Sequence, residues 1–157
     1  MKQTATFHPV TDADVKALAL DMREEDALEV QRSSGFTPLE AIERSIAASD
    51  GRAFAARIDG DLVAVFGIVA ADMLGGVGVP WLLTSKLAEL HRGAFLRSAK
   101  DIAAIWSREF PTLLQFVDVE YVSACRFLER LGFILHPPVK YGVAQVPFYP
   151  AVRSNNV

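Results

Sequence analysis

One stretch of the sequence, Gln115 to His136, constrains the fold of this chain more than any other. It begins with a β-branched and aromatic run, Gln115 to Val119, that is typical of a buried strand. From Tyr121 onward the apolar residues recur at helical spacing with polar residues between them, which predicts an amphipathic helix. Gly132 ends this helix, because glycine takes the left-handed C′ conformation without a Cβ penalty, and Phe133-Ile134-Leu135 returns as a strand. The stretch therefore predicts a strand-helix-strand unit that builds core.

The length and composition suit one globular domain. The chain has 157 residues, of which 51% are hydrophobic and 22% are charged, and this apolar content supports a sizeable core without a second domain. We expect residues 1–150 to form the domain and Ala151 to Val157 to be a flexible tail. The net charge of −3 and the pI near 5.6 give no general attraction to nucleic acid or to an anionic membrane.

Secretion, membrane insertion and metal binding are not expected. The long apolar run from Leu62 to Ala71 is too short to span a bilayer and is typical of a buried strand. The N-terminal sequence MKQTATFHPV lacks the basic and apolar regions of a signal peptide, so we expect a cytoplasmic protein. The single cysteine, Cys125, excludes an internal disulfide and a Cys-based metal cluster, and its place on an apolar stripe predicts a small core residue. The histidines are too few and too scattered for a zinc site: His8, His91 and His136.

Start signals divide the first third of the chain into helices. Thr11 and Asp14 have the spacing of a capping box, with Asp in place of the usual Glu. Thr37-Pro38-Leu39-Glu40 combines a threonine cap, a proline suited to the first helical position and a glutamate suited to the third. The expected elements are a strand from Thr4 to His8, a helix after Thr11, a helix that ends near Ser33-Ser34-Gly35, and a helix from Pro38 to Ser49 with Leu39, Ile42, Ile46 and Ala47 inward.

The middle of the chain predicts a β-hairpin. The apolar runs Ala53 to Ile58 and Leu62 to Val69 are separated by Asp59-Gly60-Asp61, and Asp-Gly favours the tight primed turns that join antiparallel strands. The small-residue segment Ala70 to Gly78 then predicts a flexible connection to a further strand, Val79 to Leu83. Its GGVG cluster is a weak phosphate-loop signal, because it lacks the lysine and the spacing of a P-loop.

The second half of the chain predicts one long helix and a late strand. Thr84 or Ser85 can cap a short turn, and a longer helix follows from about Arg92 to Glu109. Tyr141 to Phe148 alternates as a last edge strand, with Pro147 near its end. Strands and helices thus follow in an order that implies an α/β sheet with mixed pairing, hairpins in its first half and crossovers in its second.

The ending FLERLGF resembles the C-terminal signature of the GCN5-related N-acetyltransferases (GNAT), N-x-x-A-x-x-[FL]-Y-E-K-L-G-F. Two positions depart from it: Tyr121 stands where the family often has an asparagine, and Leu128 stands where it often has the tyrosine that protonates the departing thiolate. The resemblance implies the acyl-CoA N-acyltransferase fold, a mixed but mostly antiparallel sheet flanked by helices. The agreeing residues are Ala124, Phe127, Glu129, Leu131, Gly132 and Phe133.

Other stretches resemble a narrower group, the small GNAT-like proteins of tailed phages that are related to the internal virion protein A of short-tailed coliphages. The stretches are MREEDALEV, the run from Trp81 to Ser85, and SACRFLERLG. This resemblance implies a phage or prophage protein in a bacterial host cytoplasm, or one associated with the virion, with a phage or host protein as partner.

The GNAT resemblance implies that acetyl-CoA is bound as substrate at the start of the long helix. In the family a helix N-terminus with the consensus [QR]-x-x-G-x-[GA] directs free amides at the CoA pyrophosphate. The matching segment here has Phe95 and Leu96 where small residues are usual. An ordinary helix start with a solvated Arg92 is the alternative. The implied CoA-binding residues are Leu83, Thr84, His91, Arg92, Gly93, Ala94 and Arg97.

Acyl transfer from a thioester to an amine also needs a general base and a general acid. Glu120 is the base we infer, with Asp118, Glu89 and His91 as alternatives. Leu128 cannot donate a proton, so Tyr121, on the same helical stripe, is the candidate acid. Its alternative role is an aromatic residue packed on the core.

Two functions therefore fit the sequence. The first is an acetyl-CoA-dependent N-acetyltransferase-like protein, of reduced or no activity, that acetylates a small-molecule or protein amine. The second is a non-catalytic phage structural or host-interaction protein on a GNAT scaffold. Neither involves nucleic acid or a membrane.

Overall fold

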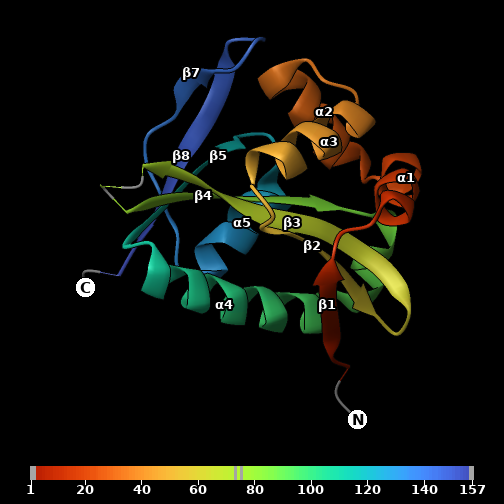
Figure 1. Ribbon diagram of the computed structural model, residues 1–157. Helices are drawn as coiled ribbons and strands as arrows, with labels where there is room; N and C mark the ends of the chain where they lie inside the picture. Colours follow the sequence, from red (N-terminus) through yellow and green to blue (C-terminus); the bar gives the residue numbers. More distant parts are fainter. Residues whose placement is uncertain (1–2, 73, 75, 156–157) are drawn as a thin grey trace.

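The computed structural model describes residues 3–72, 74 and 76–155, and its centre is an eight-stranded sheet (Figure 1). The strand order is β1-β2-β3-β4-β5-β8-β6, and β7 pairs with β8 outside this path. Neighbouring strands are antiparallel except for β4 and β5. The strands are β1 (Ala5–Pro9), β2 (Ala53–Ile58), β3 (Asp61–Asp72), β4 (Val77–Thr84), β5 (Thr112–Asp118), β6 (Ile134–Leu135), β7 (Val139–Tyr141) and β8 (Val146–Ser154).

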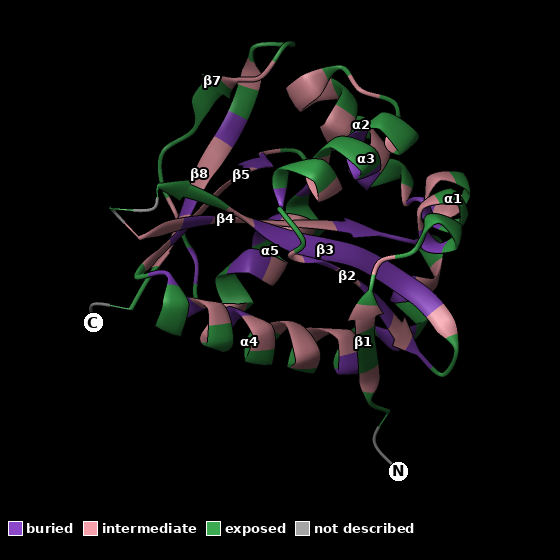
Figure 2. Cartoon of the chain, in the orientation of Figure 1, coloured by how far each residue is buried: buried purple, intermediate pink, exposed green. Residues whose placement is uncertain are grey.

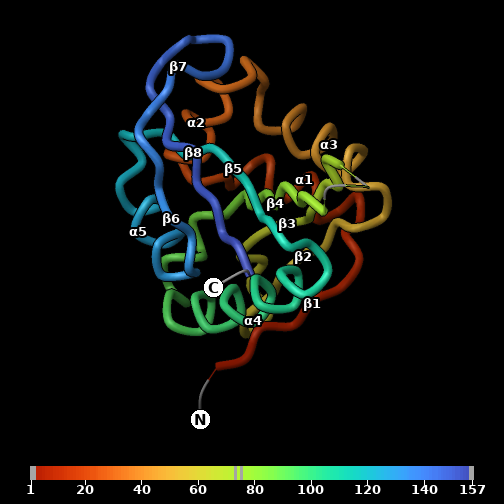
Figure 3. Tube along the Cα trace, turned by 90° about the vertical axis from the view of Figure 1, so that its left-hand side faces the viewer, coloured from red at the N-terminus to blue at the C-terminus, as the bar shows by residue number. Residues whose placement is uncertain are grey.

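Helices cover both faces of the sheet (Figures 1 and 3). On one face α1 and α3 pack through Leu18 and Ile42 against Val65 of the sheet. On the other face lie α4 and α5, each over its own apolar cluster. Among the described residues no helix is long and apolar enough to cross a membrane. The helices are α1 (Asp12–Asp21), α2 (Glu24–Ser34), α3 (Pro38–Ala48), the 3₁₀ helix η1 (Lys86–His91), α4 (Arg92–Glu109) and α5 (Val122–Arg130).

Buried residues follow the middle of the sheet, where β3 is covered on both faces (Figure 2). A strand with helices on both faces reads as a continuous apolar run, which explains the run from Leu62 that the sequence showed. The sheet, with helices on each face, has the mixed and mostly antiparallel architecture that was predicted.

The local signals for helix starts and turns are confirmed. The Thr11 and Thr37 hydroxyls each accept a hydrogen bond from the amide of the third helical residue, and the side chains of those residues, Asp14 and Glu40, accept one from the Thr11 and Thr37 amides. Asp59 and Gly60 both have positive φ, 52° and 83°, as a type I′ hairpin turn requires. Gly35 ends α2 in the left-handed conformation. These short-range interactions set the boundaries of the N-terminal elements.

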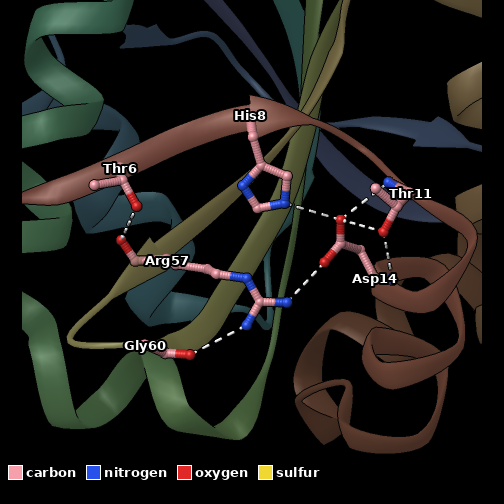
Figure 4. A network of polar contacts seen from close by, with 6 residues as sticks. All are labelled: Thr6, His8, Thr11, Asp14, Arg57 and Gly60. Atoms are coloured by element: carbon pink, nitrogen blue, oxygen red, sulfur yellow. Dashed lines mark hydrogen bonds and ion pairs between the residues drawn. The ribbon is translucent and has the colours of Figure 1, made fainter.

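The Asp14 carboxylate ties β1 and β2 to the start of α1 (Figure 4). It accepts hydrogen bonds from the Thr11 amide and hydroxyl, both 2.9 Å, from His8 Nε2 at 3.0 Å, and from Arg57 Nη2 at 2.8 Å. Burial alone would raise the pKa of this carboxyl, but these hydrogen bonds outweigh it and lower the pKa to about 2. Asp14 therefore stays ionised while it is only 1% exposed.

The C-terminal part of the prediction is wrong in two respects. The last strand is not an edge strand from Tyr141 to Phe148: β7 ends at Tyr141, and β8 lies between β5 on one side and β6 and β7 on the other. Nor is Ala151 part of a flexible tail, because it is fully buried and pairs with Gln115. Asn156 and Val157 lie outside the described residues. In α3, Leu39 and Ala47 were expected inward, but Leu39 is 43% exposed and Ala47 is exposed too.

Candidate functional site

Strands β4 and β5 diverge, and this opens the centre of the sheet. Among the described residues the two strands pair only at Val77 with Thr112 and at Gly78 with Leu113. Beyond this point β4 stays paired with β3, and β5 stays paired with β8. Pro80 contributes to the separation, because proline has no N–H to donate to a neighbouring strand. The gap therefore lies between the later parts of the two strands, which end at Thr84 and Asp118.

The pairing of β3 with β4 determines which backbone groups face the gap. The Ser85 amide donates to the Val63 carbonyl at 2.9 Å, and backbone groups alternate sides along an antiparallel strand. The amides of Leu82 and Thr84 therefore point away from β3, toward the gap. Thr84 is already bonded there, since its amide donates to Asp26 Oδ2 at 2.6 Å. The Leu82 amide faces the open part of the gap.

A cavity of about 340 Å³ occupies the gap and the space between α4 and α5. The size lies within the range of small-molecule sites. Its lining comes from both faces of the sheet, so the divergence of β4 and β5 joins the α4–α5 side to the α2 side. Lining residues include Leu82 and Thr84 on β4, Gln115 and Phe116 on β5, Phe95 and Leu96 on α4, Ala124, Phe127 and Leu128 on α5, and Asp26 and Glu29 on α2.

The part of the cavity between α4 and α5 combines aromatic and cationic side chains. Phe95 stacks on Phe127 across the two helices, with ring centroids 5.5 Å apart and planes at 22°. Arg92, Arg126 and Arg130 line the same cavity from exposed positions. The Arg92 Nε lies 3.9 Å from the Glu89 carboxylate and is otherwise directed to solvent, since its side chain is 78% exposed. This side therefore presents an apolar channel with a positive entrance.

On the α2 side, Asp26 is the centre of a buried hydrogen-bond network. Its Oδ2 accepts from the Thr84 amide and hydroxyl, at 2.6 and 2.5 Å, and its Oδ1 accepts from the Tyr121 hydroxyl at 2.6 Å. Burial raises the pKa of Asp26 above its usual range, although these hydrogen bonds and the Arg23 charge act in the opposite direction. The pKa of Tyr121 is also raised, by burial and by the adjacent Asp26.

Glu29, one helical turn after Asp26, also lines the cavity. Its Oε2 accepts from the Asp118 amide at 3.1 Å. Burial is the main cause that raises the pKa of Glu29 to about 7, with the Asp26 and Asp118 carboxylates adding to the shift and the Asp118 amide opposing it. A carboxyl with this pKa is partly ionised at neutral pH and can both accept and release a proton.

Three of the predicted site residues line the cavity: Thr84, Arg92 and Tyr121. The others lie elsewhere. Leu83 is buried in the cluster under α1 and α3. His91 lies between Gln3 and Asp61, at 3.1 and 2.9 Å.

The remaining predicted residues are accounted for by other contacts. Arg97 donates to the Gln3 carbonyl at 3.3 Å. Ala94, in the first turn of α4, packs into the apolar cluster between that helix and the sheet. Gly93 is in the exposed first turn of α4. Glu120 is exposed and pairs with Arg32 at 3.0 Å. None of these four is among the residues that line the described cavity.

Sequence reasoning missed Asp26, Glu29, Arg126 and Arg130. The two acids are three residues apart and the two arginines four apart, so each pair lies on one helical face, a signal that the sequence does carry. Cys125 is buried in the cluster under α5, which confirms its prediction as a core residue. Among the described residues, no three metal-binding side chains gather into a site.

Solved structures of acetyltransferases share this architecture. An aminoglycoside acetyltransferase, AAC(6')-Ib in complex with coenzyme A and kanamycin, is 16% identical with a TM-score of 0.70, over 97% of this chain and 95% of that chain. The chain has the GNAT fold. Ard1 from Thermoplasma volcanium is 13% identical with a TM-score of 0.68, over 96% and 97% of the two chains. A spermidine N-acetyltransferase SpeG chimera from Vibrio cholerae and hSSAT is 8% identical with a TM-score of 0.69, over 96% and 95%.

At these identities the likeness establishes the GNAT fold alone. No family model matches the sequence, and no curated protein matches it.

Proposed function

We propose that this protein is an acetyl-CoA-dependent N-acetyltransferase. One observation carries the proposal: the diverging β4 and β5 enclose a cavity that reaches from a positive entrance to the partly buried Glu29 carboxyl. A thioester that enters from one face of the sheet and an amine that enters from the other would meet in the gap. Coenzyme A in the solved AAC(6')-Ib structure of the same fold supports the choice of donor.

The phosphates of acetyl-CoA would bind at the entrance. Arg92, Arg126 and Arg130 line it from two helices, and guanidinium groups match phosphate oxygens in geometry and charge. The apolar side chains of Phe95, Phe127 and Leu82 line the cavity and suit contact with the pantetheine arm. The inferred binding residues thus keep Arg92 from the sequence prediction and add the two arginines of α5.

The thioester carbonyl would accept a hydrogen bond from the Leu82 amide. This N–H faces the open part of the gap, and a fixed backbone donor stabilises the oxyanion that forms when an amine attacks. The strand itself holds the donor, so no reorganisation accompanies the reaction.

Glu29 would act as the general base. The amine nitrogen attacks the thioester carbon, its proton passes to the Glu29 carboxylate, and the C–S bond breaks to release the CoA thiolate and the acetylated amine. A base with a pKa of about 7 balances proton affinity against availability at neutral pH. This role replaces Glu120, whose side chain is 66% exposed and paired with Arg32.

The acceptor would approach from the α2 side, beside the stacked rings of Phe116 and Tyr141, whose centroids are 4.2 Å apart. A small-molecule amine or a protein amine remains the prediction for this acceptor. Kanamycin in the AAC(6')-Ib complex and spermidine in the name of SpeG supply the first compounds to assay.

Calorimetry with acetyl-CoA, followed by thiol release with a panel of amines, tests the proposal. Wild type should bind acetyl-CoA, Arg126→Glu should bind it more weakly, and Glu29→Gln should bind it but lose turnover. Arg108→Glu is the matched control, because Arg108 is exposed on α4 and does not line this cavity. Absence of a binding signal at millimolar acetyl-CoA, together with no rise in the thermal unfolding midpoint, would refute the proposal, because a ligand that binds the folded state also stabilises it.

A non-catalytic role is the second candidate. It is favoured by Leu128, which lines the cavity without a proton to donate, and by the stack of Phe95 on Phe127 across the entrance channel. The kinship with phage GNAT-like proteins, a phage or host partner, and association with the virion belong to this candidate as predictions. Failure of acetyl-CoA to bind would favour it.

A further inference from the structure

The cavity extends beyond the gap between β4 and β5, beneath α4. Residues of β1, β2 and β3 line it as well, together with the side of α4 that faces the sheet. β1 and β5 are four strand spacings apart, so at about 4.8 Å per spacing the lining spans roughly 19 Å of the sheet. We call this part of the cavity the α4 arm, and its walls are Ala5, Phe7, Ala56, Phe66, Ser98 and Ile102.

The α4 arm begins beside Leu82, whose amide we assign to the thioester carbonyl. Phe66 lies directly opposite Leu82 in the pairing of β3 with β4, and directly opposite residues present their side chains on the same face of a sheet. Phe54 is the partner of Phe66 on β2. Ala56, two residues further along β2, faces the same side and pairs with Phe7 of β1. A chain attached to the thioester carbon can therefore run from the gap across these strands.

α4 covers its face of the sheet less tightly than α1 and α3 cover theirs. Under α1 and α3, Leu18 and Ile42 are fully buried. On the other face, Ile102 and Trp106 pack from α4 onto the apolar cluster of the sheet but are only partly buried. Ala56 contributes no more than a methyl group between the larger side chains of this face. Because protein interiors are normally close-packed, the arm is space that the chain's own side chains leave open.

The walls of the α4 arm select an apolar occupant. Five of the six residues that define it are apolar, Ser98 being the exception. A polar or charged group would lose its hydrogen bonds with water there, whereas a hydrocarbon chain is stabilised by burial. The phosphates of CoA belong instead at the arginine-lined entrance between α4 and α5. The group of the donor that can occupy the arm is therefore its acyl chain.

We propose that the α4 arm binds the hydrocarbon tail of a straight-chain acyl group, so that the protein accepts medium-chain acyl-CoA as well as acetyl-CoA. The inference rests on the proposed function and extends only the acyl group of the donor. The transfer step keeps the same bonds: the amine nitrogen bonds to the thioester carbon, the amine proton passes to Glu29, and the C–S bond breaks to release the CoA thiolate. The tail stays on the acyl carbon in the amide product.

Calorimetry with acetyl-CoA, butanoyl-CoA and octanoyl-CoA tests the inference. Each methylene that the arm buries should lower the dissociation constant by up to about fourfold. Octanoyl-CoA, with six more methylenes than acetyl-CoA, should bind at least about 10²-fold more tightly, and butanoyl-CoA should lie between them. Thiol release from octanoyl-CoA with the amine that wild type acetylates best should accompany this binding.

Two variants place a larger side chain in the arm from opposite walls. Ala56→Leu fills it from β2, and Ser98→Leu fills it from α4. In each, the ratio of the acetyl-CoA to the octanoyl-CoA dissociation constant should fall toward one, and Ser98→Leu preserves the test if Ala56→Leu does not fold. Ala104→Leu is the matched control, because Ala104 lies on α4 but is not among the described residues that line this cavity. It should keep the wild-type ratio.

Equal dissociation constants of wild type for acetyl-CoA and octanoyl-CoA would overturn the inference and leave the proposed function intact. The wild-type ratio in both Ala56→Leu and Ser98→Leu would also overturn it, because the tail would then bind elsewhere. Tight binding of octanoyl-CoA without thiol release, while acetyl-CoA is turned over, would overturn its role as a donor. A wild-type protein that binds neither thioester would overturn the inference and the proposed function together.

Discussion

The Glu29 carboxyl accepts a hydrogen bond from the Asp118 amide at 3.1 Å, and this contact joins α2 to the end of β5. It places a carboxyl with a pKa of about 7 in the cavity wall. Two properties of the molecule, its stability and its proposed chemistry, therefore depend on the same group.

Replacement of Glu29 should change stability in a pH-dependent way. The folded pKa of about 7 lies above the ordinary value of 4.5, so the fold favours the protonated carboxyl. That contribution is fully present below pH 4.5 and is lost as the pH rises through 7. Glu29→Gln should therefore match wild type at pH 4.5 and exceed it by up to about 3 kcal/mol at pH 9.

Urea unfolding at the two pH values measures this difference. Glu24→Gln, an exposed change on the same helix, should be neutral at both. Equal stability of wild type and Glu29→Gln at pH 9 would contradict the assigned pKa.

The Asp14 network should stabilise the fold with the opposite pH dependence to that of Glu29. The folded pKa of Asp14 is about 2, below the ordinary value of 3.8, so its stabilisation is present above pH 3.8 and is lost as the pH falls toward 2. Asp14→Asn removes charge-assisted hydrogen bonds from His8 and Arg57 and should lower the free energy of unfolding by about 2 kcal/mol at pH 7. The deficit should shrink at pH 2, as followed by urea titration. Asp12→Asn, in the exposed first turn of α1, should cost less than about 1 kcal/mol.

The loop between β7 and β8 should tolerate no side chain at Gly142. The backbone amides of this loop bond to the end of α2: Val143 donates to the Ser33 carbonyl and Ala144 to the Arg32 carbonyl. Figures 1 and 3 show the β7–β8 hairpin lying close to α2. A Cβ at Gly142 would lie 2.4 Å from the Ser33 carbonyl oxygen, and φ is +72°. Gly142→Ala should therefore displace the loop and speed hydrogen exchange of the Val143 amide.

Gly51→Ala is the control for backbone strain. Gly51 has a similar φ of +83° with no atom within 4 Å of an added Cβ. The free energy of unfolding of Gly51→Ala should therefore fall by about 1 kcal/mol, from the left-handed conformation alone. If Gly142→Ala lowers the free energy of unfolding by no more than Gly51→Ala does, the loop does not pack against α2 as described.

The sequence predicted the fold where short-range interactions decide it. Thr11 and Thr37 cap helices through residues three positions away, so a local pattern is sufficient. β8 was misread because its register is set by long-range partners: Ala151 lies opposite Gln115, and Leu135 lies beside it. Pro147 made this segment look like a strand end.

The site was predictable only in part for the same reason. Tyr121 and Arg92 belong to recognisable helix starts. Asp26 instead closes the acidic run Glu24-Glu25-Asp26, which is typical of a solvated first turn. Its burial arises only when α2 packs over the end of β4 and Asp26 binds Thr84, 58 residues later in the chain. No local pattern records that contact.

The two arginines of α5 should make acetyl-CoA binding sensitive to salt. Arg126 and Arg130 are exposed and line the cavity, and salt screens attraction between exposed charges. Each arginine should contribute up to about fivefold in affinity, the equivalent of an exposed ion pair of about 1 kcal/mol. The dissociation constant of acetyl-CoA should rise between 50 and roughly 500 mM NaCl, a range over which the Debye length shrinks severalfold. In the double variant Arg126→Gln/Arg130→Gln this rise should be smaller.

S-acetylpantetheine, which lacks phosphates, is the control ligand. It should bind wild type and the double variant alike and independently of salt. An unchanged salt dependence of acetyl-CoA binding in the double variant would place the phosphates elsewhere.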